Sequence, residues 1–431
     1  MIRNFCIIAL MKRRVRILHT SDWHLGQKFM HLDRREESRL ALDWLLGALQ
    51  EYDVDVLLVS GDVFDTGSPP SYAEEQYYRF LAGLAGTSCR QIVITAGNHD
   101  SPAHLEAPRR LLEALNIHVR VRVVGNEKAA SRQDDSLLIP LHDTDGELLS
   151  VVAASPFLRD RDLGPGLAGE HTADRQQRIR ERIKAHYREL GQAMETYREA
   201  DVPLIAMGHL YARGAEASDP ERQKNIYLGD EKNMAASDFP EVFSYVALGH
   251  IHRAQAVDKK GRVRYSGSLI PLSFRETIDD KSVTLTTWEG GKLIETQLLP
   301  VPLFRRLKTL RGKTGEELLG KLQAFAERHE KDPLRPWLEM ILEGDRAEAG
   351  LRLRLQEEAS KLNMELLQLR LQHKRTAWMQ EDTELVLEQL HPREVFEERC
   401  RSAQLPEDEM KKLQQTFDEL LEWMQQSEEG I

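Results

Sequence analysis

Short apolar runs alternate with amphipathic stretches over roughly the first 300 residues of the chain. The runs are rich in leucine and β-branched residues, which is typical of buried strands, and the stretches between them have the apolar spacing of helices. The runs are VRILHT, VDVLLVS, QIVITA, SLLIPL, LLSVVAAS, VPLIAMG, YVALG, RVRYSG and SVTLTTW, and helices are expected near 34–50, 70–86, 102–115 and 170–199. This alternation predicts a layered α/β domain that closes with a hairpin turning at Gly290 and Gly291.

After about residue 302 the pattern changes. A smaller β-α-β-α-β unit is expected, with strands near FRRLKTL, PWLEMILEG and MELLQLRLQ. From about residue 390 only helical spacing remains, and an apolar stripe between Met410 and Met424 has no remaining core to cover. Such a stripe predicts docking on a partner protein, with folding back onto the smaller unit as the alternative. The expected parts are an N-terminal extension (1–11), a main domain (12–301), the smaller unit (302–372) and a helical segment (373–431).

Composition places the chain among soluble globular proteins. Its 431 residues are 41% hydrophobic and 30% charged, which suits one large domain with smaller additions. Three cysteines without a CxxC spacing argue against a disulfide framework and a thiolate zinc site, and favour the reducing cytoplasm. No apolar stretch approaches the roughly 18–20 residues of a membrane helix, so no membrane partner is expected. The formal charge of −11 argues only weakly against nucleic acid, because acidic residues can serve as metal ligands.

Five of the apolar runs end in polar clusters drawn from aspartate, asparagine and histidine. They read ILHTSDWH, VLLVSGDVFD, VITAGNHD, LIAMGH and VALGHIH. Each cluster alone is more often an ordinary turn or a half-buried polar residue. Five independent turns, however, have no reason to use the same three side-chain types, and strand carboxyl ends are where sites assemble in α/β sheets. The clusters therefore predict a single metal-binding cleft.

The side chains in these clusters narrow the choice of metal. Imidazole, carboxylate and amide oxygen without thiolate suit manganese, iron or a mixed pair. Two cations roughly 3.5–4 Å apart can clamp the attacking and leaving oxygens of an in-line displacement at phosphorus. Such a pair needs a bridging carboxylate, and Asp62, with a second aspartate three residues on, is the expected bridge.

The ordered motifs DWH, GDVFD, GNHD, GH and GHIH resemble those of the calcineurin-like metallophosphoesterase superfamily. LHTSDWHLG, GDVFDTGSPPSYA, AGNHDSP, ALGHIHRAQ and IPLSF further resemble the nuclease subunits of bacterial SbcCD complexes, from about Val15 to the C-terminus. The resemblance implies a layered β-sandwich flanked by helices, a small α+β capping domain and a C-terminal helical partner-binding segment. The stretch SGSLIPL departs from the family's more frequent Gly-Ser-Pro, but it leaves every expected ligand intact.

The resemblance also implies a role for individual residues. Each of two metals would have three ligands of its own and share a seventh. These are Asp22, His24 and His252 for one metal, Asn98, His209 and His250 for the other, and Asp62 for both. His99 matches the catalytic histidine, which meets the phosphate and assists departure of the leaving oxygen. Asp65 matches the position that orients this histidine, with capping of the following turn as the alternative.

The implied activity is that of a metal-dependent DNA phosphodiesterase, a double-strand exonuclease and single-strand or hairpin endonuclease in DNA end processing. The implied cofactors are two divalent ions, Mn²⁺ first, with Mg²⁺ or Fe²⁺ as alternatives. The implied partners are DNA, the coiled-coil ATPase SbcC, and a second copy of the chain within a heterotetramer. The chain itself has no Walker motif, so no ATP site is expected in it.

Three alternatives remain open on the sequence. A metallophosphatase or nucleotide phosphodiesterase would use the same metals, although GDVFDTG and GNHD do not match the phosphatase signatures Gly-Asp-x-x-Asp-Arg-Gly and Gly-Asn-His-Glu. FRRLKTLRGK has five basic residues and no acidic one, so it is either a DNA-facing strand of the capping domain or a solvated face. RQQRIRERIKAHYREL is expected to be a solvated surface helix rather than a binding element.

Overall fold

The computed structural model describes residues 13–123, 136–159, 162–163, 171–218, 234–329, 332–344, 350–372, 413 and 416–417. The chain forms two compact units, Met1–Gln372 and His373–Ile431. The expected extension at 1–11 and nearly all of the expected helical segment after residue 372 lie outside the described residues. In the described part, no helix combines the length and the hydrophobicity needed to cross a membrane.

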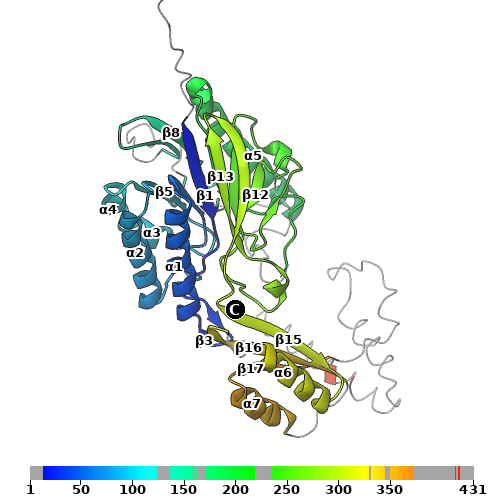
Figure 1. Ribbon diagram of the computed structural model, residues 1–431. Helices are drawn as coiled ribbons and strands as arrows, with labels where there is room; N and C mark the ends of the chain where they lie inside the picture. Colours follow the sequence, from blue (N-terminus) through cyan, green and yellow to red (C-terminus); the bar gives the residue numbers. More distant parts are fainter. Residues whose placement is uncertain are drawn as a thin grey trace, which may run out of the picture. The chain divides into compact units, whose positions relative to one another are not determined.

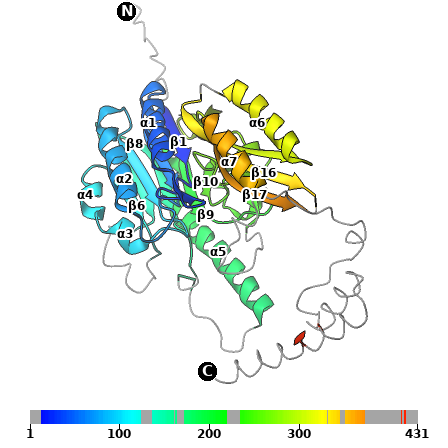
Figure 2. The same cartoon turned by 90° about the horizontal axis from the view of Figure 1, so that it is seen from below.

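Two six-stranded sheets form the larger part of the first unit (Figures 1 and 2). The first has the order β14-β13-β1-β4-β5-β6 and the second β11-β12-β10-β9-β8-β7. The strands of the first are β1 (Arg14–Thr20), β4 (Val56–Ser60), β5 (Gln91–Thr95), β6 (Ile117–Arg120), β13 (Ser282–Glu289) and β14 (Lys292–Pro300). Those of the second are β7 (Leu138–His142), β8 (Leu148–Ala154), β9 (Leu204–His209), β10 (Tyr245–Gly249), β11 (Gln255–Ala256) and β12 (Val263–Tyr265).

Strand residues alternate between two hydrophobic cores. Val56 and Leu58 of β4 pack between the sheets, whereas Leu57 and Val59 pack in the core beneath the helices. A strand covered on both faces needs apolar residues at every position, which is why these runs appear in the sequence without polar alternation. All nine predicted runs form strands, and β13 and β14 form the predicted hairpin.

Helices cover the outer faces of both sheets. Helices α1 (Arg35–Glu51) and α2 (Ser71–Gly83) contribute to the core of the first sheet's outer face, and α5 (Thr172–Met194) packs on the second. The stretch expected to be a solvated surface helix lies within α5, which is an amphipathic helix at the surface. Ile179, Ile183 and Tyr187 recur every fourth residue and bury one stripe of the helix against the sheet, while charged residues occupy the rest of its surface.

The helix expected at 102–115 is two short helices. They are α3 (Pro102–Glu106) and α4 (Arg109–Glu113), and Pro108 lies at the N-cap of the second. Proline lacks the amide donor that a continuing helix needs, so residue 108 cannot extend the hydrogen bonding of the first helix. The apolar spacing predicted the helical region, and the proline explains where it breaks.

Within the first unit, the smaller part expected at residues 302–372 has the expected β-α-β-α-β order. Its three parallel strands have the order β15-β16-β17, and its two helices contribute to a single core on one side of the sheet (Figure 2). The elements are β15 (Arg305–Gly312), α6 (Gly315–His329), β16 (Leu334–Glu343), α7 (Leu351–Lys361) and β17 (Glu365–Gln372). We refer to this unit as the capping domain.

An aromatic cluster and a buried ion pair join the capping domain to the main domain. Trp337 of β16 packs against Phe29 of the short strand β2 (Lys28–Phe29), with ring centroids 5.6 Å apart, and Phe29 also meets Phe274 within the same buried cluster. The Arg305 guanidinium lies 4.2 Å from the Trp337 ring centroid and donates to Glu37 at 2.6 Å. Arg305, one of the five basic residues of FRRLKTLRGK, is thus engaged within the protein.

Candidate metal centre

The five polar clusters follow β1, β4, β5, β9 and β10, and the structure brings them together. Backbone hydrogen bonds join the first two loops, from the Asp22 amide to the Gly61 carbonyl and from the His24 amide to the Asp62 carbonyl, both at 3.0 Å. The Asp22 carboxylate accepts from the His250 amide at 2.9 Å, which ties in the loop after β10. The three-dimensional arrangement therefore matches the single cleft expected from the sequence.

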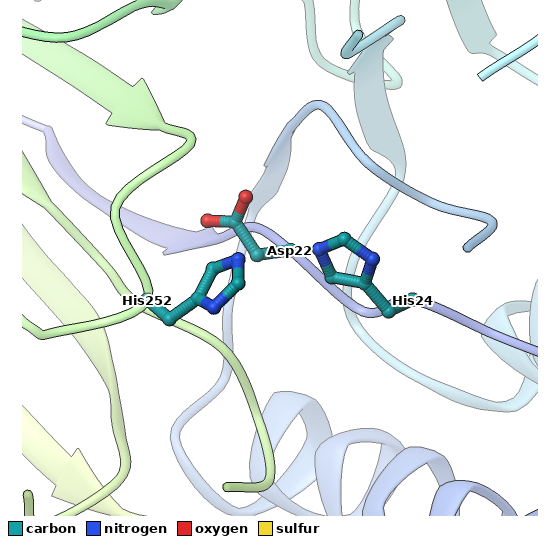
Figure 3. A group of neighbouring side chains, drawn as sticks. All are labelled: Asp22, His24 and His252. Atoms are coloured by element: carbon teal, nitrogen blue, oxygen red, sulfur yellow. The ribbon is translucent and has the colours of Figure 1, made fainter. Parts of the chain in front are cut away.

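The first group of ligand atoms belongs to Asp22, His24 and His252. One ligand atom from each lies within 4.8 Å of the others, and all three residues are buried. Figure 3 shows that Asp22 and His24 come from one segment and His252 from another, with the three side chains gathered around a common space. This is the set predicted for one metal.

The second group belongs to Asp62, His209 and His250, whose ligand atoms also lie within 4.8 Å of one another. Asn98 joins them, because its Oδ1 is 3.0 Å from His209 Nε2 and 3.1 Å from His250 Nδ1. The two groups meet at Asp62. Its Oδ2 lies 3.6 Å from His24 Nε2 and 3.2 Å from His209 Nε2, so one carboxylate oxygen stands between the two sets.

Three of the four histidines in these groups make a hydrogen bond at Nδ1 to a residue that is not a predicted ligand. The partners are the Asp65 carboxylate for His24 (3.0 Å), the Ser60 carbonyl for His209 (3.0 Å) and the Glu276 carboxylate for His252 (2.8 Å). A partner at Nδ1 fixes the tautomer and leaves Nε2 as the ligand nitrogen. Sequence reasoning missed Glu276, because a single glutamate 24 residues beyond its histidine lies outside any strand-end cluster.

Residue 65 contacts both the first metal group and the predicted catalytic histidine. Its carboxylate accepts from His24, while its main-chain carbonyl accepts from His99 Nδ1 at 2.8 Å. The sequence-based expectation concerned orientation of His99, and this hydrogen bond to it is made by the backbone. The His99 side chain is exposed, unlike the metal-group histidines, and its ring meets that of His24 edge to face at 4.9 Å.

Close packing explains why glycine precedes several of these residues. A Cβ at Gly97 would collide with Asp62 Oδ1, and a Cβ at Gly61 would collide with His209 Nδ1. Buried Asp100 holds the same loops together by accepting from the amides of Val63 (3.2 Å), Phe64 (2.9 Å) and Gly97 (2.8 Å). Asp100 is therefore a structural residue, in keeping with its absence from the predicted ligands.

The charges in the cleft are strongly coupled. Burial raises the pKa of the Asp62 carboxyl, but the neighbouring histidines, His209 first, hold that pKa well below its usual range. Burial lowers the pKa of His209, but Asp62 outweighs it and raises the pKa to about 9. Burial, together with His209, lowers the pKa of His250 to about 3. The centre thus keeps Asp62 ionised and His250 neutral, and it stabilises positive charge beside Asp62.

The residues present fit divalent metal ions. Within the described part of the chain, His24 Nε2 and His250 Nε2 are buried without a hydrogen-bond partner. A buried polar atom left in this state costs roughly 1–3 kcal/mol, and a cation in each ligand group would satisfy these two nitrogens. The donor set of imidazole, carboxylate and amide without thiolate also suits manganese or iron.

Comparison with known families gives two matches along the chain. Residues 15–254 match the calcineurin-like phosphoesterase family, and residues 303–404 match a family described as the type 5 capsule protein repressor C-terminal domain. A crystal structure of a dimetal phosphatase from Danio rerio is 13% identical and covers 67% of this chain and 99% of its own, with a TM-score of 0.38. That structural likeness is too weak to support a conclusion.

Similar proteins from several bacteria are named as the D subunit of the nuclease SbcCD. The one from Escherichia coli strain K12 is 36% identical over 94% of this chain and 97% of its own. Those from Rhodobacter capsulatus and Bacillus subtilis are 38% and 34% identical, over 77% and 64% of this chain and 81% and 67% of their own. The predicted fold class and family are thereby confirmed. The chain belongs to the calcineurin-like phosphoesterases and, within them, to the family of SbcCD nuclease D subunits.

Proposed function

We propose that this chain is the nuclease subunit of an SbcCD-type complex. It cuts DNA phosphodiester bonds with two divalent ions, as a double-strand exonuclease and a single-strand or hairpin endonuclease in DNA end processing in the cytoplasm. Family membership supports the hydrolase class. The observation that carries the two-metal site is the place of Asp62 Oδ2 between the two ligand groups. We assign catalysis to residues 12–301, DNA contact to 302–372 and partner binding to 373–431.

Seven side chains are proposed to hold the metals. The ligands are Asp22, His24 and His252 for one ion, Asn98, His209 and His250 for the other, and Asp62 for both. Mn²⁺ is the proposed ion because nitrogen and oxygen donors without thiolate suit it. Bound there, the two ions would activate a water and offset negative charge on the phosphate.

The chain's own residues supply position and proton transfer. The partners at Nδ1 of His24, His209 and His252 fix the ring orientations, so the ligand nitrogens are in place before substrate arrives. His99 lies beside this cluster but is exposed, as a group that meets substrate must be. Because its Nδ1 donates to the Asp65 carbonyl, Nε2 is the atom that, when protonated, can donate to the leaving oxygen.

We also propose that the chain acts with SbcC and as a homodimer within a heterotetramer. Its relatives are named as D subunits of SbcCD, and this shared name supports a partnership with SbcC. The apolar stripe between residues 410 and 424 would dock on that partner, which would supply the ATP dependence that this chain's sequence does not provide. The helices that follow GDVFD and GNHD would form the homodimer contact.

His99→Ala tests the proposed reaction. Cleavage of duplex and hairpin DNA with Mn²⁺ should fall by at least about 100-fold, because a positioned proton donor contributes about that much or more. Both metals should remain bound, since His99 is not a proposed ligand. His104→Ala is the matched control, because His104 pairs with Glu74 and has no assigned role.

Wild-type protein should be assayed on a phosphopeptide and a cyclic nucleotide beside DNA. Faster hydrolysis of either small substrate would favour the phosphatase or nucleotide phosphodiesterase alternative. Normal DNA cleavage by His99→Ala would contradict the role given to this histidine.

A further inference from the structure

A buried ion pair holds His252 from outside the centre. His252 Nδ1 is 2.8 Å from Glu276 Oε1, and Glu276 has no exposed surface. Lys281 Nζ donates to Glu276 Oε2 at 2.9 Å and also to the main-chain carbonyl of His252 at 2.9 Å. The pair therefore grips both the ring and the backbone of one proposed ligand.

The position of Glu276 is itself tightly fixed. Its second oxygen, Oε2, accepts from the Leu272 amide at 3.0 Å in addition to Lys281. Leu272 belongs to the IPLSF stretch, whose Pro271 carbonyl accepts from Arg34 and whose Phe274 packs against Phe29. This segment has no ligand of its own, yet its backbone sets the place of the carboxylate behind His252.

A stabilising role does not explain this arrangement well. Removing two charges from water costs several kcal/mol per ion, so a buried ion pair is often no more stable than apolar residues of similar size. The other two histidines with partners at Nδ1 differ. His24 uses Asp65, whose side chain is 20% exposed, and His209 uses a neutral carbonyl. Among these three, only His252 has a fully buried carboxylate as its partner.

We propose that Glu276, balanced by Lys281, is a positioning residue that fixes the His252 ring and directs its Nε2 to the first metal position. A carboxylate at Nδ1 fixes the tautomer that leaves a lone pair on Nε2 and makes the imidazole a stronger ligand. The inference rests on the proposed function in one respect, that His252 is a metal ligand. It adds a residue to the centre and explains the IPLSF stretch.

Glu276→Gln tests the proposal, since glutamine keeps the shape and removes the charge. Mn²⁺ binding, followed by isothermal titration and electron paramagnetic resonance, should show one of two sites weakened by about 10- to 100-fold. The spin-coupled Mn²⁺ pair should be lost at low metal and should return when excess Mn²⁺ is added. Return of the spin-coupled pair at excess Mn²⁺ indicates a positioning role. A folding defect would affect both metal sites, and added metal would not restore one of them selectively. His252→Ala identifies the affected site, because it should weaken the same binding step.

Two further variants complete the experiment. Glu339→Gln is the matched control, because Glu339 is a buried carboxylate of the capping domain that pairs with Arg370 and should leave both metal sites intact. Glu276→Gln leaves the Lys281 charge buried without its carboxylate partner, which could prevent folding. The double variant Glu276→Gln with Lys281→Gln removes both charges, so metal binding can be measured on it if the single variant does not fold. Reduced affinity at the His252 step supports the proposal.

Two wild-type-like Mn²⁺ sites in a folded Glu276 variant would overturn it. Metal binding is measured without DNA, so this result is distinct from failure of the nuclease assignment. If the nuclease assignment failed, wild-type protein would bind two ions and fail to cut DNA.

Discussion

Four of the proposed metal ligands have a positive φ angle, which residues other than glycine rarely adopt. The φ angles are 52° for Asp22, 46° for His24, 50° for Asp62 and 96° for His250. A residue other than glycine in the left-handed region costs roughly 1–2 kcal/mol, and the surrounding structure must hold it there. Here the backbone bonds of Asp22 and His24 to the loop of Asp62 contribute to that hold. Strain at four points of one cleft indicates that the position of the donors, rather than stability, is being optimised.

Asp62→Asn isolates the charge of the shared ligand, because asparagine tolerates a positive φ. Mn²⁺ at about 100 times its Kd should stabilise the wild type by roughly 2.7 kcal/mol per site, and the variant should gain less than half of the total. Differential scanning calorimetry with Mn²⁺ and with EDTA measures this gain. Asp145→Asn, a change in an exposed turn, is the control and should retain all of it. An equal gain in Asp62→Asn would remove Asp62 from the centre.

His186 provides a pH dependence separate from the metal centre. Burial lowers its pKa from 6.5 to about 4, and its Nε2 lies 3.0 Å from Ser155 Oγ. Between pH 6.5 and 4 the unfolded chain therefore binds a proton at His186 that the folded chain does not bind. The free energy of unfolding falls as pH falls from about 6.5 to 4. His186→Gln should remove on the order of 2 kcal/mol of this loss. Urea unfolding in EDTA at pH 7 and pH 5 measures it, and equal losses in both proteins would contradict the assignment.

The gathering of the proposed ligand side chains was predictable where the sequence itself repeated a signal. The proposed ligand histidines and Asp62 each follow an apolar run, so five similar strand ends pointed to them together. Glu276 had no such signal, because its carboxylate reaches His252 only through the folding of the IPLSF segment. Sequence patterns record the strand that carries a ligand, and they do not record what stands behind the ligand in space.

At the scale of elements, burial decided which predictions succeeded. Central strands such as β4 and β5 are covered on both faces, so their sequences are continuously apolar. Strand β6 was missed because its four residues, Ile117–Arg120, include His118 and Arg120 and form no apolar run. The buried stripe of helix α5 gave no clear signal, because buried residues such as Ile179, Ile183 and Tyr187 stand among many charges. Short edge strands and narrow apolar stripes need tertiary contacts to be recognised.

DNA contact is expected on the face of the capping-domain sheet opposite α6 and α7, beyond the part that packs on the main domain. Leu310 of β15 packs into the core with α6 and α7, so Arg311, the next residue of the strand, lies on the other side and is exposed. Lys313, just after the strand, is exposed as well. Replacing both by glutamine should weaken DNA binding uniformly across sequences. It should also lower the slope of log K against log salt by up to about 2, because each phosphate contact contributes about 0.9.

Fluorescence polarisation in EDTA, which prevents cleavage, measures this binding. Lys361→Gln is the control, because Lys361 is an exposed lysine of α7, on the helix side of the sheet. An unchanged salt slope in the double variant would assign Arg311 and Lys313 to an ordinary solvated face.

At the scale of the molecule, a series of polar contacts connects the capping domain to the metal centre through the IPLSF stretch. Arg305 of the capping domain pairs with Glu37, Glu37 pairs with Arg34, and Arg34 donates to the Pro271 carbonyl. The next residue, Leu272, donates to Glu276 behind His252. These contacts fix Glu276 relative to the capping domain.

The proposed homodimer makes an expectation about the surface of the molecule. Large apolar side chains are exposed on the helices that follow GDVFD and GNHD, namely Tyr78 of α2 (40%), Leu111 of α4 (67%) and Leu115 just after it (58%). Helices α2 and α4 lie on the same flank in Figures 1 and 2. A cluster of exposed apolar residues marks a contact surface, whereas single exposed leucines do not.

Leu111→Arg tests this surface, because a charge at the centre of an apolar contact must be desolvated without a partner. The dimer Kd should rise by at least about 10-fold, equivalent to about 1.4 kcal/mol. Sedimentation equilibrium over a range of concentrations measures it. Leu353→Arg, at a leucine of α7 that is 62% exposed, carries the same change to a surface with no proposed partner and should leave the dimer intact. Because all seven ligands come from one chain, both variants should still hydrolyse a small phosphodiester. A dimer unaffected by Leu111→Arg, or a wild type that stays monomeric, would remove these helices from the interface.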